Sequence, residues 1–143
     1  MTGGTQVLSN RGRLLPALLL CLSGCASIPE HVSELPADVS LDLDRTPFFP
    51  QERFQCGPAA LTTVLVASGA DVSLDAIVDQ VYLPGREGSL QIELSAAART
   101  HGRIPYTIDG TLAAVLAELK AGRPVLVLQN LGVAAIPRWH YAV

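Results

Sequence analysis

One stretch of this chain decides its fold: Gln51-Glu52-Arg53-Phe54-Gln55-Cys56-Gly57-Pro58-Ala59-Ala60-Leu61. Proline is favoured in the first turn of a helix, and apolar residues recur after it with helical spacing, so the stretch predicts a helix that begins at Cys56. A cysteine in a first helical turn lies beside unpaired backbone N–H groups and the positive end of the helix dipole. Both favour the thiolate, which is the nucleophilic form of cysteine. Cys56 is therefore the candidate nucleophile.

The composition is that of one globular domain with a substantial core. The chain has 143 residues, of which 49% are hydrophobic and 16% are charged, and its mean hydropathy is +0.35. This balance excludes intrinsic disorder as the general description. The net charge of −3 and the lack of a lysine or arginine cluster exclude a basic nucleic-acid binder, so no nucleic-acid partner is predicted. The longest apolar run, Leu14–Leu22, is much shorter than the ~20 residues of a transmembrane helix.

The N-terminus has the three parts of a secretory signal. Arg11 and Arg13 stand in an acid-free start, the apolar run 14–22 follows, and small residues lead to Cys25. The tetrad Leu22-Ser23-Gly24-Cys25 resembles a bacterial lipobox, which implies that Cys25 is acylated and becomes the first residue of the mature chain. An ordinary signal peptide and a buried helix with a chance cysteine are the alternatives. The alanine after Cys25 resembles lipoproteins that are sorted to the outer membrane and face the periplasm.

Three segments follow from this signal: a lipoprotein signal peptide over residues 1–24, a tether over 25–46, and a folded domain over 47–143. The tether is rich in proline and acidic residues and has no hydrophobic periodicity, as in a flexible spacer. Processing removes one cysteine and acylation consumes another, which leaves Cys56 as the sole free thiol of an exported domain. A lone thiol in an oxidising compartment is a liability unless it is buried or catalytic.

Hydrophobic spacing and capping residues predict an α+β fold, with helices first and strands last. The helix from Cys56 is expected to end at Gly69, and hydroxyl caps are expected at Ser73, Ser89 and Thr111. The complete set is helices at 56–69, 74–81, 90–101 and 112–120, and strands at 104–108, 125–128 and 139–143. The N-terminal helices are expected to pack on a C-terminal antiparallel sheet.

A cysteine nucleophile needs a base, and His140 in the last predicted strand is the candidate. The cysteine and histidine of such pairs are commonly distant in sequence and adjacent in the fold. Without Cys56, His140 would be interpreted as a satisfied histidine on a half-buried strand. Gln51 can offer an amide N–H to the anionic tetrahedral intermediate of acyl transfer. Gln55 is the alternative donor, but an extended approach to the helix would point it away from the pocket.

Two blocks of the sequence resemble a known family. They are Phe48-Phe49-Pro50-Gln51 with Gln55-Cys56-Gly57-Pro58-Ala59-Ala60-Leu61, and Trp139-His140-Tyr141-Ala142-Val143. Together, in this order, they are similar to the bacteriocin-processing cysteine peptidases that cleave double-glycine leaders, and to papain-like relatives of those enzymes. The resemblance spans about residues 47–143. It implies a papain-like fold, Cys56 as nucleophile, His140 as base, Gln51 as oxyanion donor, and a peptide or protein as substrate.

Two departures from that family pattern bear on the chemistry. The family's third residue, an aspartate or asparagine that orients the histidine, lies in the next strand, and this sequence ends at Val143. We therefore expect a C-terminally truncated domain with an incomplete sheet and an exposed last strand. Asp109 is expected to be a turn residue, with replacement of the missing orienter as the alternative. Gln51 also stands one residue closer to Cys56 than the glutamine of papain-like enzymes does.

Two functions are compatible with these residues. The first is a membrane-anchored cysteine peptidase that hydrolyses peptide bonds by thiolate attack, with small residues such as paired glycines before the scissile bond. The alternative is a non-catalytic lipoprotein module that keeps the papain-like fold for peptide binding or assembly. No cofactor and no metal are predicted, because the histidines at positions 31, 101 and 140 lack ligand spacing and no phosphate-binding loop is present. The composition does not predict an oligomeric state.

Overall fold

The computed structural model describes residues 46–143. The predicted signal peptide, the acylation at Cys25 and the tether up to residue 45 lie outside these residues. The described elements are α2 (Cys56–Ala67), α3 (Leu74–Val81), the 3-10 helix η3 (Pro84–Arg86), α4 (Gln91–Thr100), α5 (Leu112–Lys120), β1 (Val127–Asn130) and β2 (Trp139–Ala142). None of the helices within the described range is long and apolar enough to cross a bilayer.

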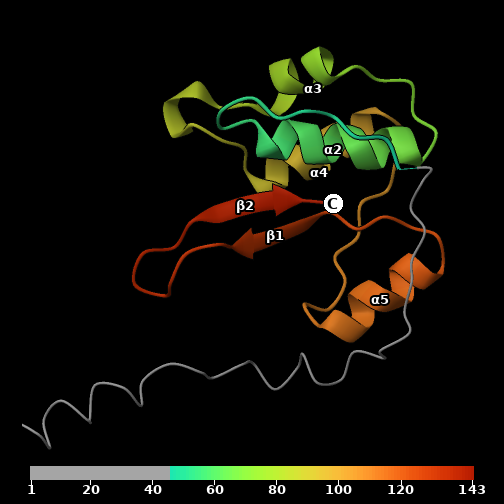
Figure 1. Cartoon of the computed structure of the whole chain (residues 1–143). Helices are drawn as coiled ribbons and strands as arrows, with labels where there is room; N and C mark the ends of the chain where they lie inside the picture. The colour runs from blue at the N-terminus through green and yellow to red at the C-terminus, as the bar shows by residue number, and fades with distance from the viewer. Residues whose placement is uncertain (1–45) are drawn as a thin grey trace, which may run out of the picture. The chain divides into compact units, whose positions relative to one another are not determined.

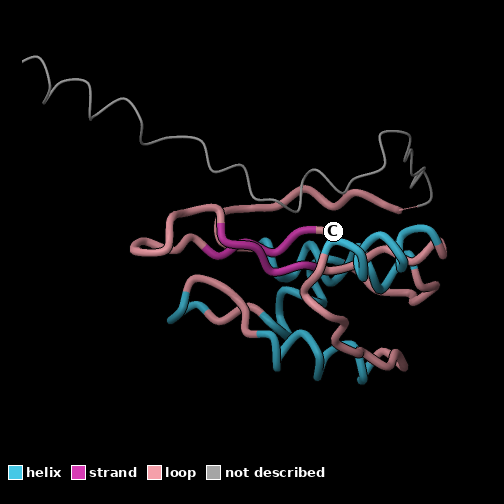
Figure 2. Tube along the Cα trace, turned by 90° about the horizontal axis from the view of Figure 1, so that it is seen from below, coloured by secondary structure: helices cyan, strands magenta, loops and turns pink. Residues whose placement is uncertain are grey.

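The elements form a helical layer against a small antiparallel sheet. Strands β1 and β2 pair with each other and lie side by side in both views (Figures 1 and 2). Helix α2 contacts β2, and α3 and α4 pack on α2, while α5 stands apart from these three helices (Figure 1). The predicted α+β class and the antiparallel pairing of the C-terminal strands are therefore confirmed.

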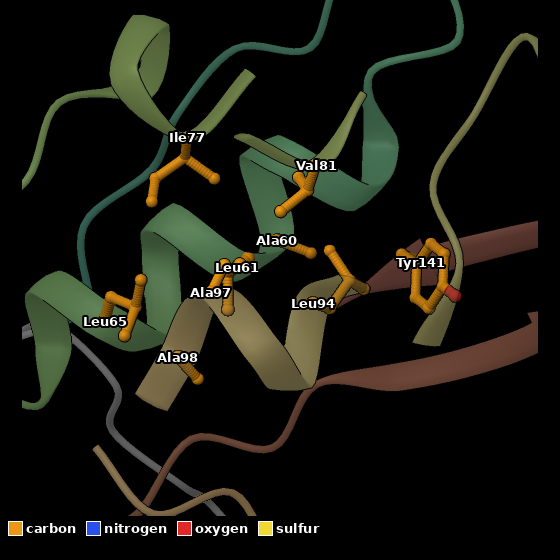
Figure 3. Packing of buried hydrophobic residues seen from close by; sticks show 9 residues of the cluster. All are labelled: Ala60, Leu61, Leu65, Ile77, Val81, Leu94, Ala97, Ala98 and Tyr141. Carbon is orange, nitrogen blue, oxygen red and sulfur yellow. The ribbon is translucent and has the colours of Figure 1, made fainter. Parts of the chain in front are cut away.

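The core lies where α2, α3, α4 and β2 meet. Ile77 and Val81, from α3, are fully buried against α2. Three alanines in this cluster keep side chains short where helices cross, so the helix backbones can approach closely. The buried cluster consists of Ala60, Leu61, Leu65, Ile77, Val81, Leu94, Ala97, Ala98 and Tyr141 (Figure 3). Tyr141 is the only member of this set that comes from the sheet, so it joins the sheet to the helices.

Two of the three predicted hydroxyl caps are confirmed. The side chains of Ser73 and Thr111 each accept a hydrogen bond from a backbone N–H three residues later, at 3.2 Å. The predicted cap at Ser89 is wrong: α4 begins at Gln91 after Leu90, and no side chain caps it. The Ser89 hydroxyl is instead buried against Gly57 of α2 and has no hydrogen-bond partner within the described residues. The Ser89 side chain therefore packs against α2 and does not cap α4.

The predicted strand over 104–108 is also wrong. These residues have no regular structure, and Ile104 is 87% exposed. A strand needs a neighbour for its backbone hydrogen bonds, and in the described part of the chain β1 and β2 pair only with each other. The Tyr106 hydroxyl instead donates a hydrogen bond to a carboxylate oxygen of Glu118, at 2.9 Å. Apolar and polar residues alternate over 104–108 as in a strand, but no strand of the described residues pairs with this segment.

The strand predicted at 125–128 lies two residues later, at Val127–Asn130. It is not buried as predicted, because its first two residues are half-buried and its last two are exposed. The hairpin sets this register, because Asn130 faces Trp139 across the pair and its side chain holds the connecting loop. The last strand begins at Trp139, as predicted.

Candidate active site

Cys56 is the first residue of α2 and is half-buried. The start of this helix has no side-chain cap and no acidic residue in its first turn. The helix is 12 residues long, so its backbone dipoles add over several turns. This helix start would therefore stabilise a negative charge on the Cys56 sulfur. The predicted location of the candidate nucleophile is confirmed, and its role remains a prediction.

A tight turn, and not an extended segment, leads into the helix. The Gln55 N–H donates to the Glu52 carbonyl at 3.1 Å, and Phe54 has a left-handed backbone, with φ of 66°. For a residue with a Cβ this conformation costs on the order of 1–2 kcal/mol. The Arg53 guanidinium lies 4.7 Å from the centre of the Phe54 ring and offsets part of that cost by a cation–π contact. The extended approach assumed for Gln55 is thus wrong.

Gly57 allows the start of α2 to approach two distant segments. A Cβ at this position would lie 2.7 Å from Ser89 Cβ, 2.8 Å from Ser89 Oγ and 3.4 Å from Tyr141 Cδ2. Distances below 3.0 Å are not tolerated by carbon atoms, so only glycine fits here without movement of its neighbours. The residue next to Cys56 is therefore the point where α2, the segment before α4 and strand β2 come together.

Tyr141 is the strand residue that faces this point. It is 6% exposed, and its hydroxyl donates a weak hydrogen bond to the Ser89 carbonyl at 3.4 Å. Burial raises the pKa of Tyr141, and the nearby Cys56 sulfur raises it further, because a negative thiolate opposes a negative phenolate. Sequence reasoning missed this contact. The available signal was that Tyr141 directly follows the candidate base in a predicted strand, where successive side chains alternate between the two faces.

The raised pKa of Tyr141 predicts a loss of stability at alkaline pH. Above about pH 10 the unfolded chain ionises this tyrosine while the folded chain keeps it protonated, so the free energy of unfolding falls as the pH rises towards the folded pKa. The Tyr141→Phe variant lacks this group and should lose less stability between about pH 8 and about pH 11. Urea unfolding of both proteins at the two pH values measures the difference. An equal loss in the two proteins would contradict the buried position of the hydroxyl.

His140 lies next to Tyr141 in β2 and opposite Gln129 of β1. Successive side chains leave a strand on opposite faces, so His140 and Tyr141 do not share a face. Tyr141 faces α2, and His140 is half-buried on the other side of the strand. Within residues 46–143 no hydrogen bond links Cys56 and His140. The structure therefore brings the backbone of the candidate base to the start of α2, with Tyr141 as the side chain in contact.

The other candidate residues lie farther from this contact. Gln51 is exposed in the segment before the turn, whereas Gln55 directly precedes α2 and is half-buried. Asp109 is exposed in the connection before α5 and has no hydrogen bond to His140. His101 ends α4, and its ring pairs with the Gln80 side chain at 3.2 Å. Gln55 is thus closer to the helix start along the chain than the preferred donor Gln51.

A groove of about 870 Å³ opens beside the core and has Tyr141 in its wall. The second half of α2, one side of α4, the segment 103–112, helix α5 and the segment 122–128 line the rest of it. Cys56, His140 and Gln51 do not line it. Tyr141 therefore lies both in the wall of this groove and near the candidate nucleophile.

No family model, curated protein or solved structure matches this chain. The similarity of the Cys56 and His140 blocks to papain-like peptidases accordingly stays a prediction.

Proposed function

We propose that this chain is a cysteine peptidase of papain-like type that hydrolyses a peptide or protein substrate. The observation that carries the proposal is the position of Cys56. It is the first residue of α2, a 12-residue helix whose start has no side-chain cap and no acidic residue. The same helix packs against β2, the strand that contains His140. Helix starts of this kind favour the thiolate. His140 of that strand is the base in our proposal, and its ring must turn towards the sulfur for the reaction, because β2 places Tyr141 on the face towards α2.

The proposed reaction is a two-step acyl transfer. The Cys56 thiolate attacks the carbonyl carbon of the scissile bond, and the C–N bond breaks as His140 gives a proton to the leaving amine. Water, from which His140 then removes a proton, attacks the thioester, the C–S bond breaks, and the carboxylic acid leaves while the Cys56 thiolate and the protonated His140 are restored. Backbone N–H groups at the helix start and a glutamine amide, Gln51 in our proposal, stabilise the tetrahedral oxyanion of each step.

A non-catalytic module for peptide binding or assembly is the second candidate function. The specific observation that favours it is the strand alternation at β2, which turns Tyr141 and not His140 towards α2. In that case Cys56 is a half-buried packing residue, and the groove beside Tyr141 is the binding surface.

The pH dependence of Cys56 alkylation distinguishes the two functions. If the pair forms, iodoacetamide should react with the Cys25→Ala, Cys21→Ala chain at lower pH than with an ordinary thiol, and His140→Ala should move the profile upwards. His101→Ala is the matched control, because its ring is bound to Gln80 at the end of another helix. Gln51→Ala should leave the profile in place and impair peptide turnover. A profile typical of a free thiol, unmoved by His140→Ala, would favour the binding module.

We further propose that acylation of Cys25 anchors the chain to the outer membrane, on the side that faces the periplasm. Metabolic labelling with a fatty-acid analogue in a Gram-negative host should tag the wild-type chain and leave Cys25→Ala untagged. Cys21→Ala is the matched control, since this cysteine lies within the predicted signal and is removed with it. Equal labelling of wild type and Cys25→Ala would contradict the anchor.

A further inference from the structure

The connection between β1 and β2, taken together with Trp139 at the start of β2, is here called the hairpin tip (residues 131–139), and it carries apolar side chains that the core does not use. Figure 1 shows this connection projecting from the sheet, away from the helices. The exposed side chains are Leu131, Val133, Ile136 and Trp139, each between 62% and 70% exposed. Four large apolar groups gathered on one short connection are unusual for a surface that meets only water.

The hairpin tip is held in one conformation by its own hydrogen bonds. The side-chain oxygen of Asn130 accepts from the N–H groups of Gly132, at 2.9 Å, and Arg138, at 2.8 Å. The Leu131 N–H donates to the Arg138 carbonyl, and the Ile136 N–H to the Val133 carbonyl. A Cβ on Gly132 would collide with the Ile136 carbonyl, so the loop is closed tightly. The backbone of the tip therefore needs little further ordering on binding.

Arg138 is the only charged residue of the hairpin tip. No aspartate or glutamate occurs after Glu118, although acidic residues outnumber basic ones in the whole chain, 13 to 10. Arg138 lies within the tip, between Pro137 and Trp139. An arginine beside a tryptophan is typical of side chains that meet the headgroup region of a bilayer, where the ring is half in hydrocarbon and the cation meets phosphate.

We propose that the hairpin tip inserts into the interfacial region of a phospholipid bilayer that carries anionic headgroups. Non-aqueous surroundings penalise unpaired backbone groups, and four N–H groups of the tip are already paired inside the hairpin. Pro137 has no N–H to satisfy. Insertion would place the apolar side chains among acyl chains and Arg138 at the phosphates, and would fix how the domain is oriented on the membrane.

A lipid surface fits this feature better than a protein partner does. A stable protein–protein interface takes about 20–30 residues a side and a complementary surface. The tip is a single narrow projection, whereas a bilayer needs no complementary shape and accepts apolar groups in proportion to the area that they bury.

Trp139 provides the test, because it is the only tryptophan of the chain. The full chain is mixed with vesicles of phosphatidylethanolamine and phosphatidylglycerol, and tryptophan emission is recorded with and without brominated lipids. We expect a blue shift and quenching, both smaller with phosphatidylcholine vesicles. Ile136→Ser should reduce the shift and the quenching, and Leu131→Ser should do the same. Ile92→Ser is the matched control, because Ile92 lies outside the tip and is 72% exposed, against 70% for Ile136; it should change neither.

The readout is specific for the tip, because the apolar N-terminal run can attach the chain to vesicles without moving Trp139 into lipid. Emission that stays unchanged, with or without co-sedimentation of the chain, would overturn the proposal. A blue shift that needs no vesicles and grows with protein concentration would assign the surface to a second copy of the chain and also overturn it. Equal shifts in anionic and phosphatidylcholine vesicles would overturn the part of the proposal that rests on Arg138.

Discussion

Replacing His140 with alanine is expected to lower the rate of peptide hydrolysis on the order of 10⁴–10⁶-fold, and replacing Cys56 with alanine should cost about as much. The double variant should lose no more than either single variant, because nucleophile and base act in one step and the loss of one removes the use of the other. Initial rates on fluorogenic peptides with paired glycines before the scissile bond measure all three losses.

His101→Ala is the matched control for this series and should keep wild-type rates, since His101 pairs with Gln80 at the end of α4. Losses that simply multiply in the double variant would mean that the two residues act independently, which contradicts the proposed pair. A wild-type chain that binds such peptides and releases no product would support the binding module instead.

The second large effect is expected at Gly57. The Gly57→Ala variant places a Cβ 2.7 Å from Ser89 Cβ and 2.8 Å from Ser89 Oγ, and overpacking of this kind costs about 1–3 kcal/mol. Alanine is intrinsically better than glycine in a helix, so the measured loss is the clash less that gain. Urea unfolding measures the free energy of unfolding of the variant and of the wild type.

A second substitution separates the clash from other causes. Ser89→Gly removes both close atoms and leaves only the 3.4 Å contact with Tyr141, so Gly57→Ala in that background should cost little or should stabilise. Gly110→Ala is the control, since no atom lies within 4 Å of a Cβ there and its backbone is not left-handed. A Gly57→Ala loss that persists in the Ser89→Gly background would contradict the packing of α2 on the segment before α4.

Features set by neighbouring residues could be predicted from the sequence. Pro58 indicated where α2 starts, and Gly69 lies just after its end. Ser73 caps α3 and Thr111 caps α5, as predicted. Each depends on backbone groups within a few residues, so the local pattern contains the needed information.

Features set by distant segments could not be predicted in this way. Ser89 has the same capping chemistry as Ser73, but its hydroxyl is buried against Gly57, far away in sequence. The alternation over 104–108 has the pattern of a strand and lacks a partner to pair with. The contact of Tyr141 with the start of α2 depends on the face that β2 turns to the helix, which a shift of a single residue would reverse.

The same contact has a consequence for the order in which the molecule matures. A polypeptide is synthesised from its N-terminus, so α2 is complete long before the ribosome has made β2. Until Tyr141 docks, nothing from the sheet covers the Gly57 side of the helix, and the Cys56 thiol is open to oxidants. Oxidation of a thiolate to sulfenic acid and beyond is selective for such accessible cysteines. Docking of Tyr141 therefore shortens the time for which the Cys56 thiol is open to oxidation.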